Sequence, residues 1–534
     1  MSAVKFPFFT ASSSYLSLLR SNCPRKTRIS SHFKKCVLFC AVITTLYVMS
    51  KIKCFIGKAM PILEISGNDV RDFHQQWCRM HRWRVDWEQM AKPCENQMAW
   101  EQRPKSSEWK TDARSSFIVK LEIQPAGHFS RFFIQSVTKN GVMKGFGGDA
   151  WRVYMRQGPA SLAPQVWDHD NGQYEVLFLP IEPGNYSAQI ILDFTLCDGL
   201  REPPVDWFIR GTIQGKHQPH GILGYIADDY ILEPLGGQTT VTFFIPERAD
   251  NIGVSPIAEA PSCGIPCFLL QDGFGRWVND QWLPYVQDYI PPDETRTLTP
   301  AADTLLIYGD SVAKQFFKSV TKRRICERYF KQCQYSYVWI YELTSINDAK
   351  SKFVPNDFDA TIILDYMASV LDSPGLKHQN SLFLFNLGVH YHISINFTTF
   401  KDLIDNVVKL INNKVLQKGE NVAIFPVWKT ATSIEREKAH KLYPELLPTN
   451  VTHWRFHTHQ RLELFSKYAT SAMCKAGIPV LDVYPMTFAY PNGTYDHVHY
   501  APNAQRPAED QLLTFVEQKM RRRQRRNAQE LGYP

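Results

Sequence analysis

The chain has 534 residues, of which 44% are hydrophobic and 13% aromatic, so it is long enough for about two or three folded domains. The formal net charge of +8 comes from the two ends, because residues 1–63 hold ten basic and no acidic side chains and residues 519–526 hold six more basic ones. The rest carries 44 basic and 52 acidic side chains. A mildly acidic folded part speaks against nucleic-acid binding, which requires a basic surface.

An apolar segment at 36–49 follows a basic region rich in serine and arginine. As a helix it would span about 21 Å, short of the roughly 30 Å hydrocarbon core, but flanking lysines such as Lys35 and Lys51 can reach the lipid headgroups. The positive-inside rule then places the N-terminus in the cytosol. We therefore predict a cytosolic segment 1–35 and a signal-anchor transmembrane helix 36–52, with a cleaved signal peptide and a mitochondrial transit peptide as alternatives.

Four Asn-x-Ser/Thr sequons support a lumenal location for the rest of the chain; they are Asn185, Asn396, Asn450 and Asn492. Eight of the twelve cysteines lie beyond residue 60, an even number that is typical of disulfides in an oxidising compartment. The Cys263–Cys267 spacing also occurs in zinc sites, but no second Cys/His pair follows at finger spacing, which favours disulfides. We predict a Golgi or other secretory-pathway membrane protein, with secretion as the alternative.

Two different patterns precede residue 260. Residues 53–110 are rich in tryptophan and charge without clear periodicity, which predicts a loosely packed stem. Residues 111–255 contain short alternating apolar runs separated by Gly and Pro turns, a pattern typical of a β-sandwich. The glycines at 145–148 lack the Lys-Ser/Thr of a phosphate loop, so we interpret them as a turn. The segments 147–153 and 168–174 resemble filamin-type immunoglobulin-like repeats.

Residues 260–526 are predicted to form a second domain. Its first part, 267–284, contains an apolar run that we expect to be too short for a pair of strands, and 285–304 is expected to be a linking loop. Beyond it, strand-like runs at 304–308, 335–341, 359–365, 381–386, 421–427 and 478–484 alternate with helix-like runs at 311–322, 399–414, 454–475 and 507–524. Such alternation predicts a three-layer α/β/α domain with a mainly parallel sheet, followed by a tail at 527–534.

The first strand-like run of this domain ends in Gly309-Asp310-Ser311. The glycine permits a sharp turn, and Asp310 is expected to make structural hydrogen bonds there. Ser311 begins the following helix, where backbone N–H groups can stabilise a developing oxyanion. Because Gly-Asp-Ser alone is more often an ordinary helix cap, the assignment of a nucleophile depends on two later motifs.

Asn386-x-Gly388 ends a second apolar run, and Asp496-x-x-His499 follows a third. A serine hydroxyl is a weak nucleophile that needs a base, a role we assign to His499, with Asp496 holding its ring in the required tautomer. The Ser311 N–H and the Asn386 side-chain amide are expected to form the oxyanion hole. Ligands of parallel sheets bind beyond the carboxyl ends of the strands, which is where these motifs lie.

The order of the motifs, with serine first, Asn-x-Gly in the middle and Asp-x-x-His last, is that of the SGNH/GDSL-type esterases, and the late Asp-x-x-His resembles their PC-esterase branch. Together with the filamin-like pattern and a Gly-x-Trp…Trp-x-Pro segment at 275–284, the chain resembles the neurexophilin and PC-esterase domain family. The same core resembles plant wall-polysaccharide O-acetyltransferases and sialate O-acetyltransferases. The resemblance implies acyl-ester chemistry on glycans, with no tightly bound cofactor and with an acetyl donor, acetyl-CoA being one candidate, as co-substrate.

We therefore predict an O-acetyltransferase that modifies glycan or glycoconjugate hydroxyls. One short helix cannot carry an activated acetyl group across a bilayer, so an acetyl-donor transporter or a lumenal donor is an implied partner. A glycan O-acetyl esterase and a non-catalytic binding protein that uses the sandwich are the alternatives. A zinc-dependent hydrolase is a third alternative function.

Two departures from the family pattern bear on this prediction. Lys314 stands where the family usually has arginine, so the charge is kept but the bidentate fork is lost. The second motif of the SGNH pattern contains a glycine that contributes to the oxyanion hole, and we find no convincing glycine for it between 335 and 375. His497 is the alternative base, since it also lies beside Asp496. His390 and His392, and the three histidines at 453, 457 and 459, could bind zinc. We favour the interpretation that they are ordinary surface residues, and we expect no metal site.

Overall fold

The computed structural model describes residues 69–530 except 103–105, 205–208, 211–212, 215–228, 249–262, 287–301, 324, 339–357, 377–380, 416–423 and 439–454. Residues Val70–Pro534 form one compact unit. The cytosolic segment and the signal anchor predicted for 1–52 lie outside the described residues. Among the helices that the structure describes, none is both long and apolar enough to cross a membrane.

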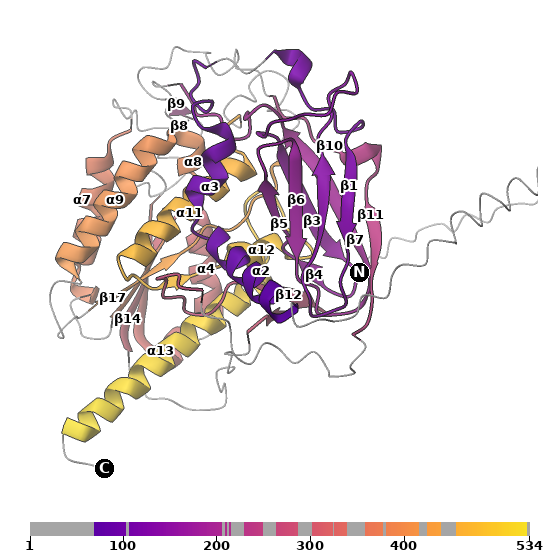
Figure 1. The fold of residues 1–534 in the computed structure, drawn as a ribbon. Coiled ribbons are helices and arrows are strands. Elements are labelled where there is room, and N and C mark those ends of the chain that lie inside the picture. The colour runs from indigo at the N-terminus through magenta and orange to yellow at the C-terminus, as the bar shows by residue number, and fades with distance from the viewer. Residues whose placement is uncertain are drawn as a thin grey trace, which may run out of the picture. The chain divides into compact units, whose positions relative to one another are not determined.

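The prediction of a β-sandwich is confirmed, since the chain forms two antiparallel sheets (Figure 1). One sheet has the order β1 (Phe117–Glu122), β2 (Ser130–Gln135), β6 (Gln173–Phe178) and β5 (Gln165–Asp168). The other runs β10 (Glu233–Pro234), β7 (Gly184–Phe194), β3 (Ala150–Gln157), β4 (Ser161–Leu162), β12 (Gly275–Val278) and β13 (Gln281–Pro284), and β11 (Val241–Ile245) also pairs with β7. Alternate residues such as Phe132, Val176 and Ile190 form the core of the sandwich.

The hairpin β12–β13 corrects the expectation that 267–284 holds no strand pair. Its two-residue turn is formed by Asn279 and Asp280, whose φ angles of 48° and 61° match the type I′ turn that suits twisted hairpins. Strand β12 also pairs with β4, so a segment from the predicted second domain completes a sheet of the first. The Trp277 indole donates to the carbonyl of Met486 at 2.8 Å, which fastens the hairpin to the α/β core.

The rest of the described chain is built around a parallel sheet. Its strand order is β15 (Phe330–Tyr337), β14 (Ala302–Gly309), β16 (Ser381–Phe385), β17 (Ile424–Lys429) and β18 (Val480–Leu481). Alternating residues of β14 point to opposite faces, since Leu306 and Tyr308 join one hydrophobic cluster and Leu305 and Ile307 another. The first cluster is covered by α7 (Ala360–Leu371), α9 (Phe397–Lys414) and α11 (His459–Lys475), and the second by α4 (Ser311–Lys322) and α13 (Pro502–Glu530) (Figure 1). Among the shorter elements are α5 (Ile325–Tyr329), α8 (Tyr391–Ser394), α12 (Tyr484–Phe488), β8 (Ile209–Arg210) and β9 (Ile213–Gln214).

The run at 359–365, predicted as a strand, is the start of helix α7. Asp359 caps it by accepting the Thr361 N–H at 2.9 Å, and Ile363, Met367 and Val370 lie on one buried stripe. The apolar run was misassigned because a short buried helix and a buried strand have the same composition.

The prediction that residues 53–110 form a loosely packed stem is also wrong. Within it, α2 (Asp69–Trp83) and α3 (Trp87–Ala91) are helical, and Trp77 is only 1% exposed. Helix α2 packs on the sandwich, where Arg79 pairs with Glu175 at 2.7 Å. Arg84 joins it to the α/β core through Asp482 at 2.6 Å. The side chain of Arg84 is only 6% exposed, and a buried ion pair of this kind requires a fixed position, so this segment is part of the folded unit.

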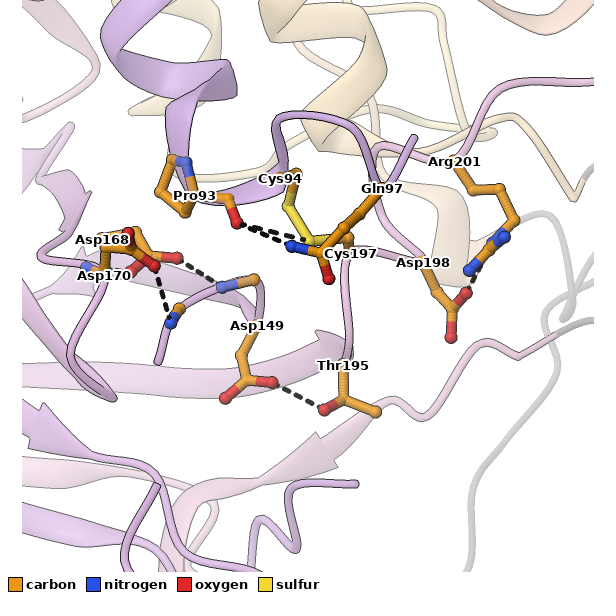
Figure 2. Close-up of a disulfide and its surroundings, with 12 residues drawn as sticks. Pro93, Cys94, Gln97, Asp149, Asp168, Asp170, Thr195, Cys197, Asp198 and Arg201 are labelled. Atoms are coloured by element: carbon orange, nitrogen blue, oxygen red, sulfur yellow. Dashed lines mark hydrogen bonds and ion pairs between the residues drawn. A yellow bond between two sulfur atoms is a disulfide. The ribbon is translucent and has the colours of Figure 1, made fainter. Parts of the chain in front are cut away.

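All eight cysteines of the described part form disulfides, as predicted, and none is a zinc ligand. The pairs are Cys78–Cys263, Cys94–Cys197, Cys267–Cys474 and Cys326–Cys333. Cys94 follows α3 and Cys197 follows β7, so this bond fixes the former stem to the sandwich (Figure 2). The Cys267–Cys474 bond fixes the segment before β12 to α11.

Candidate active site

The Gly-Asp-Ser turn lies between β14 and α4, with Asp310 as the helix cap. The Asp310 carboxylate accepts the N–H groups of Val312 at 2.9 Å and Ala313 at 3.4 Å through one oxygen. Its other oxygen accepts the Val389 N–H at 3.1 Å. Asp310 is 1% exposed, so it serves as a buried link between the serine turn and the Asn386–Gly388 loop.

Gly388 is required by this link. A Cβ atom there would lie 1.8 Å from an Asp310 carboxylate oxygen, which no side chain can tolerate. Gly309 is similarly close to the first turn of α4, because its Cβ would lie 2.7 Å from that of Ala313. Both glycines of the motifs therefore allow close approach of backbone and side chain.

Ser311, His499 and Asp496 are brought together by two hydrogen bonds. The His499 Nε2 lies 2.8 Å from the Ser311 Oγ, and its Nδ1 lies 2.7 Å from an Asp496 carboxylate oxygen. The other Asp496 oxygen accepts the backbone N–H groups of residues 497, 498 and 499 at 2.6–2.8 Å. This is the geometry that a serine nucleophile, its base and the orienting carboxylate require.

The Asp496 carboxylate is held ionised. Burial acts to raise its pKa, but the hydrogen bond from the His499 ring and those from the backbone outweigh it, so its pKa lies well below the usual value. An ionised carboxylate at Nδ1 stabilises the imidazolium that forms when His499 takes the serine proton. The ring of His497, the alternative base, lies instead against His457, with ring centroids 5.4 Å apart.

The loop that carries Asp496 and His499 is anchored by Glu435, a residue that the sequence did not single out. Its carboxylate accepts both the N–H and the hydroxyl of Thr494 at 2.8 Å. The same carboxylate pairs with Arg156 of strand β3 and with Lys438. The sandwich therefore helps to hold the loop that carries the candidate base.

The Asn386 side chain is fixed at the carboxyl end of the sheet. Its amide Nδ2 donates to the Lys429 carbonyl at 2.7 Å, which leaves the second amide hydrogen for another acceptor. The Ser311 N–H begins helix α4 and is not taken by the Asp310 cap, which uses the next two N–H groups. The two donors predicted for the oxyanion hole thus lie just beyond the ends of two adjacent parallel strands, β14 and β16.

Lys429 is a second residue that sequence reasoning missed. It ends β17, is 3% exposed and lies with its Nζ 5.8 Å from the Phe316 ring. Burial lowers its pKa to about 8, and the Asp310 carboxylate acts in the opposite direction. A cation buried beside the serine turn adds positive potential where negative charge would develop.

Tyr495 and Gln315 form an exposed rim next to the candidate triad. The Tyr495 ring is 58% exposed and lies parallel to the His499 ring, with centroids 5.9 Å apart. The Gln315 amide donates to its hydroxyl at 2.5 Å. Lys314, which replaces the family arginine, lies with its Nζ 5.7 Å from the Tyr337 ring. For Tyr495 and Gln315 the only sequence signal is their position next to the motifs.

The candidate zinc histidines are arranged differently from a metal site. His392 and His457 are buried and share a 3.1 Å hydrogen bond, and burial keeps the pKa of both rings well below the usual value. His390 lies near the Asp310 carboxylate, and burial lowers its pKa to about 4. No group of three or more potential ligands in the described part is placed to hold a metal ion, and His453 lies outside that part.

The sequons differ in accessibility. Asn185 and Asn492 are exposed, whereas Asn396 is half-buried and caps α9 by accepting the Thr399 N–H at 2.8 Å. Asn450 lies outside the described residues. Of the three sequons in the described part, Asn185 and Asn492 are therefore the more accessible ones.

Comparisons with known proteins do not extend this picture. No family model matches the chain, and a search of curated proteins finds no match. Among solved structures, the filamin domain of Lin-41 is similar at 16% identity over 16% of this chain and 82% of that one, with a TM-score of 0.14. Domains 4 and 5 of the S-layer protein SbsC are similar at 14% identity over 14% of this chain and 43% of that one, with a TM-score of 0.12. Scores this low add no argument, so the sandwich rests on its own strand pairing.

Proposed function

We propose that the chain is an acyl-transfer enzyme with an SGNH-like α/β/α domain, most specifically an O-acetyltransferase that acts on glycan hydroxyls in the secretory pathway. The observation that supports this best is the continuous hydrogen-bonded set from Ser311 through His499 to Asp496. A buried helix cap or a surface turn has no need for such a set. The motif order, which resembles the PC-esterase branch, supplies the choice of an acetyl ester as the substrate.

In the proposed reaction, the Ser311 Oγ attacks the acetyl carbonyl of a donor while His499 Nε2 takes the hydroxyl proton. The tetrahedral oxyanion is held by the Ser311 N–H and by the free hydrogen of the Asn386 amide. His499 then returns the proton to the leaving group, which leaves an acetyl ester on Ser311. In the second half, a sugar hydroxyl gives its proton to His499 and attacks that ester, so the acetyl group passes to the sugar and Ser311 is restored.

Hydrolysis is the second candidate, favoured by the accessibility of the site. The side chains of His499 and Asp496 are 22% and 18% exposed, so water can reach the acyl ester. Water is present at about 55 M, and transfer competes only when the acceptor is held in line, because oriented binding reaches effective molarities of about 10⁵ M or more. The rim formed by Tyr495 and Gln315 is the part of the site placed to hold an acceptor ring in this way.

The test is to incubate purified residues 60–534 with an artificial acetyl ester and a panel of glycans and to measure acceptor mass. Transfer adds about 42 Da per acetyl group, and Ser311→Ala abolishes it. Release of free acetate without any acetylated glycan would support the esterase activity instead of acetyl transfer. Absence of both reactions, together with no labelling of Ser311 by a fluorophosphonate probe, would leave the alternative of a binding protein.

A further inference from the structure

The largest cavity that the described residues enclose lies apart from the candidate triad. It has a volume of about 130 Å³ and lies where the sandwich, α3, α11 and α12 meet. Ser311, Asn386, Asp496 and His499 are not among its lining residues. A dry cavity of about 150 Å³ holds benzene, which has six heavy atoms, so this smaller cavity has room for a group of about five. What binds there must be a small molecule or the end of a longer one.

Aromatic rings make up much of the cavity wall. They belong to Trp83, Trp151, Trp167, Tyr174, Tyr484 and Phe488. The face of an aromatic ring carries negative potential and attracts cations. Two of these rings already do so, since the Arg79 guanidinium carbon lies 4.3 Å from the centroid of Trp167 and the Lys467 Nζ lies 3.9 Å from that of Trp83. Neither Arg79 nor Lys467 lines the cavity, so inside it the rings meet no cation from these two side chains.

Four charged side chains line the cavity, and three of them have an ion-pair partner. The pairs are Arg152–Asp193, Asp149–Lys144 and Glu463–Lys467, with N–O distances of 2.6–3.1 Å. Arg152 is the only Lys or Arg in the described part of the wall, and it also donates to Glu437 at 2.9 Å. Its three guanidinium nitrogens are all in use, so Arg152 cannot neutralise the fourth charged residue, Asp168.

Asp168 forms no ion pair with any residue that the structure describes. Its half-buried carboxylate accepts the N–H groups of Gly148 at 2.7 Å and Asp170 at 2.8 Å, one on each oxygen, and each oxygen keeps a further lone pair. Burial raises the pKa of Asp168 to about 6, and the charges of Asp149 and Asp170 act in the same direction. Figure 2 shows these three carboxylates on loops beside the Cys94–Cys197 disulfide, which also lines the cavity.

We propose that this cavity binds a trimethylammonium group, the head of a choline-type cation. Its methyl groups pack on the aromatic rings, and its positive charge lies against the Asp168 carboxylate. This head has about the five heavy atoms for which the cavity has room. Gln89 is exposed and Gln165 is half-buried, and both line the cavity, so the rest of the bound molecule can extend outwards there.

The wall also decides between related ligands. A primary ammonium has three N–H donors, and apart from Asp168 the carboxylates of the wall are already paired, whereas a trimethylammonium group has no N–H to satisfy. The same head occurs on soluble choline-type molecules and on phosphocholine lipids. A phosphocholine adds a phosphate, and the one arginine of the described wall is already bound by two carboxylates. The structure therefore favours a soluble choline-type cation over a lipid headgroup.

The test is saturation-transfer NMR with choline, using the purified full chain with Ser311→Ala so that the choline hydroxyl cannot be acylated. Choline is expected to bind saturably. Its uncharged analogue, in which a carbon atom replaces the nitrogen, has the same shape and is expected to bind about tenfold more weakly or not at all. Phosphocholine is also expected to bind more weakly than choline, and tighter binding would overturn the choice of a soluble ligand. Because Ser311 is absent, no result depends on whether the proposed acyl transfer is correct.

Two substitutions test the position of the site. Asp168→Asn keeps the size of the side chain but removes its charge, and it is expected to weaken choline binding about tenfold. Gln165→Lys adds an ammonium to the wall without changing the loop of Asp168, so it decides the matter if Asp168→Asn does not fold. It is expected to abolish choline binding, whereas the matched control Gln165→Met, which is similar in length and uncharged, should retain it. Equal binding of choline and its carbon analogue, no saturable choline binding, or unchanged binding in Gln165→Lys would each overturn the proposal.

Discussion

Glu435→Gln tests whether the loop that carries the candidate base depends on its anchor. The substitution keeps the size of the side chain but removes the negative charge that accepts from Thr494 and pairs with Arg156. Glu435 is 2% exposed, so solvent cannot replace these partners. We expect the loop from Thr494 to Tyr500, which carries Asp496 and His499, to open more often in this variant.

The magnitude follows from the pKa of Glu435. Burial acts to raise the pKa, but Arg156 and Lys438 outweigh it and lower it from 4.5 to about 2. Since one pKa unit corresponds to 1.36 kcal/mol, the ionised form is stabilised in the folded state by about 3 kcal/mol. A folded-state pKa below the unfolded value gives stability that is present above pH 4.5 and is lost as the pH falls towards 2.

The assay is hydrogen exchange of the backbone amides in the loop, measured at pH 7 by mass spectrometry. A local loss of about 3 kcal/mol lowers the protection of the amides of residues 497–499 about 10²-fold, whereas peptides from β16 keep theirs. Glu437→Gln is the matched control, because Glu437 bonds to Arg152 at 2.9 Å and makes no bond to Thr494. Unchanged protection in Glu435→Gln, or equal losses in both variants, would refute the anchoring argument. The difference in thermal midpoint between wild type and Glu435→Gln should also shrink below pH 4.5.

Three further predictions concern the site and the fold. Ser311→Ala, Asp496→Ala and His499→Ala should each abolish nearly all turnover without unfolding the protein, and a double variant should be little worse than a single one; an inactive His497→Ala beside an active His499→Ala would reverse the choice of base. Asn386→Ala should lower kcat by about two to three orders of magnitude while Ser311 still reacts with a fluorophosphonate, and full activity would remove Asn386 from the oxyanion hole. Replacing Cys94 and Cys197 by serine opens a link across 103 residues and should lower the free energy of unfolding by about 4–5 kcal/mol, measured by urea titration; a change below about 1 kcal/mol would show that this bond is dispensable.

The sequence predicted the parts of the site that depend on local rules. A polar motif directly after a buried strand of a parallel sheet must lie at the carboxyl edge, so Ser311 and Asn386 were predicted on one side of the sheet before their distance was known. Asp496 and His499 are three residues apart, and the spacing alone allows the carboxylate to reach both the ring and the backbone N–H groups of the turn. These placements needed no knowledge of how the two domains pack.

The sequence could not predict what depends on distant partners. Nothing near Glu435 or Lys429 in the chain marks them, because their roles come from Thr494, Arg156 and Asp310, which lie far away in sequence. The start of α7 has the composition of a buried strand, and only the stripe of apolar residues that continues beyond it identifies a helix. The tryptophans of the expected stem were equally ambiguous, since exposed and buried aromatics look alike without the surface against which they pack.

The contacts across the sandwich explain why the two domains behave as one unit. Arg156 leaves strand β3, donates to the Phe488 carbonyl at 2.9 Å and reaches Glu435, while β12 crosses in the other direction to complete the sheet beside β4. Arg156, Glu435 and Thr494 then form a short path from the sandwich to the loop of His499. A change in the sandwich that moves β3 therefore has a direct physical route to the base. Because this route consists of buried ion pairs whose removal leaves an unpaired charge, the sandwich supports the loop of the candidate active site.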